Sequence, residues 1–132
     1  MDLEEIVRKY NIELMITFGS YGSDRFRVDS DIDIAFQPNY DLSSQEELSL
    51  LYDLMVYFRR DRIDLVNLVK ADPLLLYEIA CNGKPAYEKR DSFLRFKLKA
   101  SARYADTKFL RDARRQWLNE QLQLFDSPKG GI

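Results

Sequence analysis

Two aspartates, Asp31 and Asp33, are the residues whose type and spacing most directly suggest chemistry. They lie in Asp31-Ile32-Asp33-Ile34-Ala35-Phe36, which is typical of a β-strand, where successive side chains alternate between faces. We therefore expect both carboxylates on one face, with Ile32 and Ile34 in the core. Adjacent carboxylates repel each other unless a cation neutralises them, and oxygen ligands with room for phosphate and water favour Mg²⁺. The alternative, a pair that caps a turn or helix, fits the following β-forming residues less well.

A second motif, Gly19-Ser20, ends the apolar run of residues 14–18, and ten residues separate it from Asp31. Glycine lets the backbone approach an anion closely. A serine at the start of a helix offers a hydroxyl and an unpaired N–H group to phosphate. A plain turn is the alternative, but the spacing to Asp31 favours a phosphate-binding loop. Together the two motifs predict a site for a nucleotide and magnesium.

Three further residues are weaker candidates for this site. Asp64 lies in a predicted strand at residues 62–69, on the same face as Val66. It is a candidate third carboxylate, or else a solvent-facing residue on an edge strand. Arg25 and Arg27 could neutralise phosphate charge, or could be solvated charges of the loop.

The segment GSYGSDRFRVDSDIDIAF, residues 19–36, resembles the minimal nucleotidyltransferases (MNT proteins) of the polymerase-β-like superfamily. Within these it is most similar to the MntA-type antitoxins encoded beside HEPN-domain toxins. The resemblance rests on Gly-Ser, a spacer and Asp-x-Asp, with Arg27 and Asp29 just before the second motif. Many members carry Ala-Arg-Gly soon after Gly-Ser, where this chain has Gly22-Ser23-Asp24.

This resemblance implies an enzyme that uses ATP and two Mg²⁺ ions, with the triphosphate on Gly19 and Ser20 and the metal on Asp31, Asp33 and Asp64. It implies transfer of AMP to a tyrosine hydroxyl of a HEPN ribonuclease toxin, which neutralises the toxin in a type VII-like toxin–antitoxin system. Two alternatives stay open: an antitoxin that acts by binding alone, and a nucleotidyltransferase for a small molecule such as an aminoglycoside. Neither a membrane nor a direct nucleic-acid substrate is expected.

Helices and strands follow one another along the part of the chain that must position the site. Helices are predicted at residues 2–10, from Ser43 or Ser44 to residue 61, and from the capping residue Asp72 to Gly83. Strands are predicted at residues 13–18, 30–36 and 62–69, and an edge strand at residues 84–87. This order predicts an α/β (α+β) domain, a small mixed sheet flanked by helices. The resemblance implies the polymerase-β-like fold, with a nucleotidyltransferase core at residues 1–90, a C-terminal helical extension at 91–126 and a flexible tail at 127–132.

The predicted C-terminal helix is long and basic. One apolar stripe follows the helical period, and a break around residues 105–108 is possible; the stripe consists of Leu94, Leu98, Ala102, Ala105, Phe109, Ala113 and Trp117. The basic residues of the helix are either a solvated face or a docking surface for a partner; they are Arg95, Lys97, Lys99, Arg103, Lys108, Arg111, Arg114 and Arg115.

Composition narrows the possible chemistry. The chain has 132 residues, which suits one domain, and no histidine, which excludes histidine-based triads, zinc ligands and general bases. Its one cysteine, Cys81, cannot form an internal disulfide and suits a reducing cytoplasm. The net charge is −2, but residues 1–66 carry 14 acids and 7 bases, whereas the rest carries 8 acids and 13 bases. The basic half is therefore a candidate surface for an acidic partner.

Overall fold

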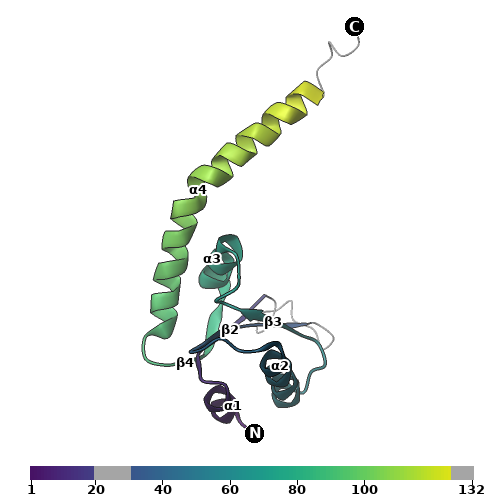
Figure 1. Ribbon diagram of the computed structural model, residues 1–132, viewed down its shortest axis with the longest axis vertical. Helices are drawn as coiled ribbons and strands as arrows, with labels where there is room; N and C mark the ends of the chain where they lie inside the picture. The colour runs from purple at the N-terminus through teal and green to yellow at the C-terminus, as the bar shows by residue number, and fades with distance from the viewer. Residues whose placement is uncertain (20–30, 126–132) are drawn as a thin grey trace.

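A computed structural model of the chain describes residues 1–19 and 31–125, and Figure 1 shows how its elements are arranged. The helices are α1 (Leu3–Lys9), α2 (Ser44–Phe58), α3 (Pro73–Asn82) and α4 (Ser92–Phe125). The strands are β1 (Ile12–Phe18), β2 (Ile32–Pro38), β3 (Ile63–Asn67) and β4 (Lys84–Glu88). All the helices and strands predicted within these residues are present.

The four strands form one mixed sheet in the order β3-β2-β1-β4. Strand β1 is antiparallel to both β2 and β4, whereas β2 and β3 are parallel. The prediction of a small mixed sheet is therefore confirmed. Strand β4 lies at the sheet's edge, where Pro85 is tolerated because one side of an edge strand forms no ladder hydrogen bonds.

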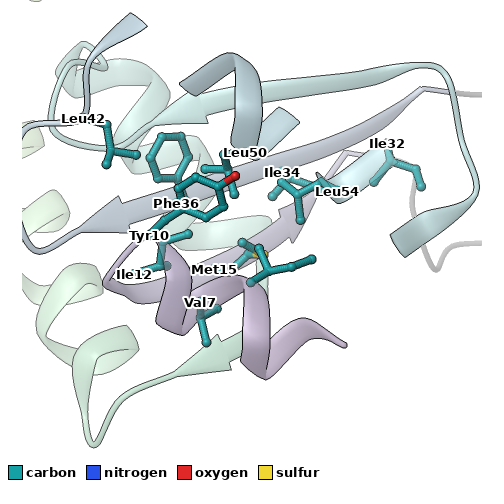
Figure 2. Packing of buried hydrophobic residues seen from close by; sticks show 11 residues of the cluster. Val7, Tyr10, Ile12, Met15, Ile32, Ile34, Phe36, Leu42, Leu50 and Leu54 are labelled. Carbon is teal, nitrogen blue, oxygen red and sulfur yellow. The ribbon is translucent and has the colours of Figure 1, made fainter. Parts of the chain in front are cut away.

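Helices cover both faces of the sheet, with α1 and α2 on one side and α3 and the first half of α4 on the other (Figure 1). This explains the near-continuous apolar run in β1. Met15 packs with α1 and α2, whereas Leu14 and Ile16 pack with α3 and α4. Figure 2 shows the first of these clusters, in which Ile34 and Phe36 of β2 lie against Leu50 and Leu54 of α2. As predicted, Ile32 and Ile34 are buried.

The helix starts follow their local signals. Ser43 caps α2, accepting a hydrogen bond from the Glu46 N–H, while the Glu46 carboxylate accepts one from the Ser43 N–H. Asp72 caps α3 by accepting a hydrogen bond from the Leu75 N–H, and Pro73 occupies the first position of the helix. Both predicted helix starts are confirmed.

Helix α4 is continuous from Ser92 to Phe125, so the break considered around residues 105–108 does not occur. The helix does change direction about midway, and its second half extends away from the body (Figure 1). Near this point the Thr107 hydroxyl donates a hydrogen bond to the Tyr104 carbonyl oxygen at 3.1 Å. Such bonds from a side chain back to the preceding turn often bend helices.

The apolar stripe predicted for this helix is not its buried face. Phe96 and Ala100 are buried against α3 and the sheet, whereas Leu94 and Leu98 are 54% and 64% exposed. The first half of α4 has apolar residues on several sides, so the helical period alone did not select the packed side. No helix in the described part of the chain is long and apolar enough to span a membrane.

Candidate active site

Asp33 and Asp64 lie side by side on neighbouring strands. Strands β2 and β3 run parallel in a register that pairs Asp33 with Asp64 and Ala35 with Val66. Ala35 and Val66 pack in the core on the α3 and α4 side of the sheet. Because side chains two residues apart in a strand share a face, both carboxylates lie on that same side, at the N-terminal end of their strands.

Gly19, which follows β1, lies next to this pair of carboxylates. Phe18, the last residue of β1, pairs with Asp33 across the antiparallel ladder, so Gly19 follows directly beside the carboxylate. Gly19 has φ +72°, a left-handed conformation that glycine adopts without strain. A Cβ atom at this position would lie 2.1 Å from Asp33 Oδ2. The glycine therefore gives the backbone its turn and leaves space for the Asp33 carboxylate.

The electrostatics of Asp33 reflect this crowding. The pKa of Asp33 is raised to about 6, most of all by partial burial and then by the charge of Asp64, a side-chain hydrogen bond to Asp64 and the charge of Asp31. A second carboxylate close to a partly buried one disfavours ionisation of the buried group. A bound cation would relieve this repulsion, which is the electrostatic condition expected of a metal-binding carboxylate pair.

The fit of this site to magnesium rests on its oxygen donors. Asp33 and Asp64 offer carboxylate oxygens, and Asp31, which is exposed, lies two residues before Asp33 and close enough to affect its pKa. Within residues 1–19 and 31–125, no group of three acidic or cysteine side chains is already arranged to hold a metal ion. The pair Asp33 and Asp64 fits Mg²⁺ when phosphate oxygens and water supply the remaining ligands, as this ion usually requires.

Three predicted site residues, Ser20, Arg25 and Arg27, lie outside the residues that the structure describes. The proposed phosphate-binding loop is thus represented only by Gly19 before it and Asp31 after it. The predicted tail at residues 127–132 also lies outside the described residues.

Lys84 is a neighbour of the candidate site that sequence reasoning missed. It begins β4 and pairs with Thr17 of β1, one residue before the Phe18 that pairs with Asp33. The exposed Lys84 therefore lies at the same end of the sheet as both carboxylates. Thr17 also pairs with Ile34 of the α1 and α2 core, so Lys84 starts from the sheet face opposite Asp33 and Asp64. The short strand was predicted from sequence, but its neighbour in the sheet was not, so nothing placed the lysine near the site.

A family model described as "Polymerase beta, Nucleotidyltransferase" matches residues 2–92, well over half of the chain. The chain belongs to this nucleotidyltransferase family. The mixed sheet with helices on both faces is its fold, as the resemblance implied. The matched residues include Gly19, both aspartates of the Asp-x-Asp motif and Asp64. A search of curated proteins found no sequence that matches this nucleotidyltransferase.

Solved structures share the fold of this nucleotidyltransferase over nearly its whole length. A toxin–antitoxin complex crystallised with AMP-PNP has a chain that is 24% identical, with a TM-score of 0.73 over 92% of this chain and 95% of that one. An MntA–HepT toxin–antitoxin structure is 22% identical, with a TM-score of 0.67 over 92% and 93% of the two chains. A tri-AMPylated HEPN toxin of Shewanella oneidensis in complex with MNT antitoxin gives 24% identity and a TM-score of 0.67, covering 92% of each chain.

Proposed function

We propose that this nucleotidyltransferase is a protein adenylyltransferase and the antitoxin of a HEPN toxin. It transfers AMP from ATP to a tyrosine hydroxyl of the toxin and so neutralises it. The observation that carries the proposal is the pairing of Asp33 with Asp64 beside Gly19 at one end of the sheet. The similarity to toxin–antitoxin structures, one with AMP-PNP and one with an AMPylated toxin, supports the choice of nucleotide and acceptor.

In the proposed site Asp31, Asp33 and Asp64 hold Mg²⁺, and Gly19 and Ser20 receive the triphosphate, with Arg25 and Arg27 balancing its charge. Bound magnesium would neutralise negative charge on the phosphates and would lower the pKa of the acceptor hydroxyl. The exposed Asp64 carboxylate accepts the proton of that hydroxyl. The tyrosine oxygen forms a bond to the α-phosphorus as the bond to the bridging oxygen breaks, and pyrophosphate leaves.

The decisive experiment incubates the protein with α-labelled ATP, Mg²⁺ and the HEPN protein encoded by the neighbouring gene. We expect label on the toxin and loss of its ribonuclease activity. The double variant Asp31→Asn/Asp33→Asn should reduce label transfer by about a thousandfold or more, because it removes two charges that organise the transferring phosphate. The variant Arg8→Gln, which changes an exposed residue of α1 on the other face of the sheet, serves as the control and should transfer label normally.

A second candidate function is an antitoxin that acts by binding alone, which the exposed second half of α4 favours as a docking element. Full neutralisation by the double variant at equal stoichiometry would select this function. Label found on an added aminoglycoside, and never on protein, would instead select a small-molecule nucleotidyltransferase.

A further inference from the structure

A cavity of about 460 Å³ lies on the α3 and α4 side of the sheet, remote from the candidate active site. The floor of the cavity is apolar. It is formed by Leu68 just after β3, Leu76 of α3, and Phe96 and Ala100 of α4. Glu13 and Gln37, at the opposite end of the sheet from Asp33, also line the cavity. The volume lies in the range of roughly 300–1,000 Å³ that is common for binding pockets.

One wall of the cavity is strongly basic. Arg95, Lys99 and Arg103 line it from successive turns of α4, and Glu13 is the one acidic residue of the lining. In the described part of the chain, none of these three basic side chains forms an ion pair or a hydrogen bond. Two other bases of the helix do have partners: Lys108 pairs with Asp112, and the Arg111 guanidinium lies over the Tyr104 ring. The basic residues of α4 therefore differ in their surroundings, and the cavity gathers three that have no such partner.

The same side of α4 continues as an apolar stripe beyond the body. Leu110, Trp117 and Leu124 follow Arg103 at intervals of seven residues, so all four share one side of the helix. These three apolar side chains are 66%, 57% and 65% exposed. The second half of α4 extends away from the other elements, which leaves this stripe uncovered among the described residues (Figure 1). A helix with such a stripe usually packs against another helix.

We propose that the cavity and this stripe form one docking surface, the α4 surface, for an acidic amphipathic helix of the HEPN partner. The partner helix packs along Leu110, Trp117 and Leu124 and places an apolar side chain and a carboxylate in the cavity, against Lys99 and Arg103. This inference rests on the proposed function for the identity of the partner. It adds where that partner binds and what chemistry its contacting helix carries.

The basic charge of α4, and the continuity of the cavity with the stripe, favour an acidic helix as the occupant of the α4 surface. Helix α4 contains eight basic and three acidic residues, so a symmetric pairing of two copies through it would bring like charges together. A small amphipathic anion would fill the cavity but would leave the stripe exposed. An acidic amphipathic helix can place carboxylates against the basic wall and pack its apolar side chains on the stripe at the same time.

The test compares charge reversals by isothermal titration calorimetry of the full chain with the HEPN protein encoded by the neighbouring gene. Lys99→Glu/Arg103→Glu should weaken binding at least tenfold. The control Arg8→Glu/Arg59→Glu makes the same charge change on α1 and after α2, on the other face of the sheet, and should stay within twofold of wild type.

A second pair of variants tests the stripe. Leu110→Ser/Trp117→Ser should also weaken binding at least tenfold, whereas Leu94→Ser/Leu122→Ser, which removes similarly exposed apolar side chains from other sides of α4, should not. All four side chains are exposed, so folding is expected to survive, and circular dichroism checks this. Binding at the wild-type level by the two test variants overturns the proposal, as does equal loss in test and control variants.

Transfer is measured separately with labelled ATP. A wild-type chain that binds the HEPN protein through the α4 surface but transfers no AMP would contradict the enzymatic function and leave the docking surface standing. A wild-type chain that does not bind the HEPN protein, or that self-associates through the α4 surface in analytical ultracentrifugation, would overturn the docking proposal.

Discussion

Gly19 and Asp33 depend on each other for their geometry. The left-handed backbone at Gly19 ends β1, and the Asp33 carboxylate occupies the space that a side chain at Gly19 would need. Sequence motifs present the two residues as separate features of one site. Their contact makes the glycine a positioning residue for the carboxylate as well as the start of a phosphate-binding loop.

Gly19→Ala is therefore expected to damage the candidate site more than the fold. The new methyl group would meet Asp33 Oδ2 at 2.1 Å and would stand on a backbone with φ +72°. Strain of this kind costs on the order of 1–2 kcal/mol of stability. We expect the free energy of unfolding to fall by about that amount in urea titrations, and AMP transfer to fall more than tenfold. Activity that remains at wild-type level would contradict the proposed role of the Asp33 position.

The raised pKa of Asp33 predicts a pH dependence of stability. The native state holds this proton with a pKa of about 6, whereas a free aspartate has a pKa of 3.8. Between these values the unfolded state releases its proton while the native state retains it, so this residue's contribution to the free energy of unfolding decreases as pH rises. The loss begins near pH 4 and is complete above about pH 7.

Urea titrations of wild type and Asp33→Asn across pH 4 to 8 measure this effect. The stability of the variant relative to wild type should increase with pH and level off above about pH 7. Added Mg²⁺ should reduce the difference at pH 7, because a bound cation compensates the ionised carboxylates. A difference that stays constant with pH would show that Asp33 titrates as an ordinary aspartate.

At the scale of elements, the attachment of α4 to α3 decides where the long helix points. The Tyr77 ring of α3 stacks on the Tyr104 ring of α4, with centroids 3.9 Å apart and planes 13° apart. The Arg111 guanidinium lies 3.7 Å from the centre of the Tyr104 ring. This layered contact lies near the middle of α4, where the helix leaves the body, and so orients its second half.

Tyr77→Leu should loosen this attachment. Leucine keeps an apolar contact but loses the ring stack, which is worth about 0.5–1.5 kcal/mol. We expect a decrease of that size in the free energy of unfolding and weaker HEPN binding. Tyr77→Phe keeps the ring and should behave as wild type in both measurements. Equal effects of the two substitutions would indicate that the hydroxyl, rather than the stack, matters.

For the whole molecule, the described residues divide into a body with two cores and a projecting helix. The sheet separates the core under α1 and α2 from the core under α3 and the first half of α4. The described side chains of α4 after Arg111 are all exposed and add nothing to either core. Stability and partner binding should therefore be separable along α4.

Truncation after Arg111 tests this separation. The shortened chain should unfold at the same temperature as the full chain within about 2 °C, since no buried apolar surface is lost. It should transfer AMP poorly at low toxin concentration, because it lacks Trp117 and Leu124 of the stripe on the α4 surface. A large decrease in the unfolding temperature would mean that the second half of α4 contributes to the fold.

The sequence by itself determined what depends on near neighbours in the chain. Strand alternation placed Ile32 and Ile34 in the core and predicted that Asp31 and Asp33 share one face. Capping residues marked where helices begin. The Gly-Ser and Asp-x-Asp motifs indicated the family correctly. These features follow from local backbone geometry, which a few consecutive residues control.

Only the tertiary structure decided which distant residues meet. The parallel register of β2 and β3 sets Asp64 beside Asp33, and the place of β4 next to β1 brings Lys84 to the same end of the sheet. Packing against α3 likewise chose Phe96 and Ala100, rather than the stripe through Leu94 and Leu98, as the buried side of α4. Strand pairing and helix packing depend on the summed fit of whole surfaces, which no local pattern contains.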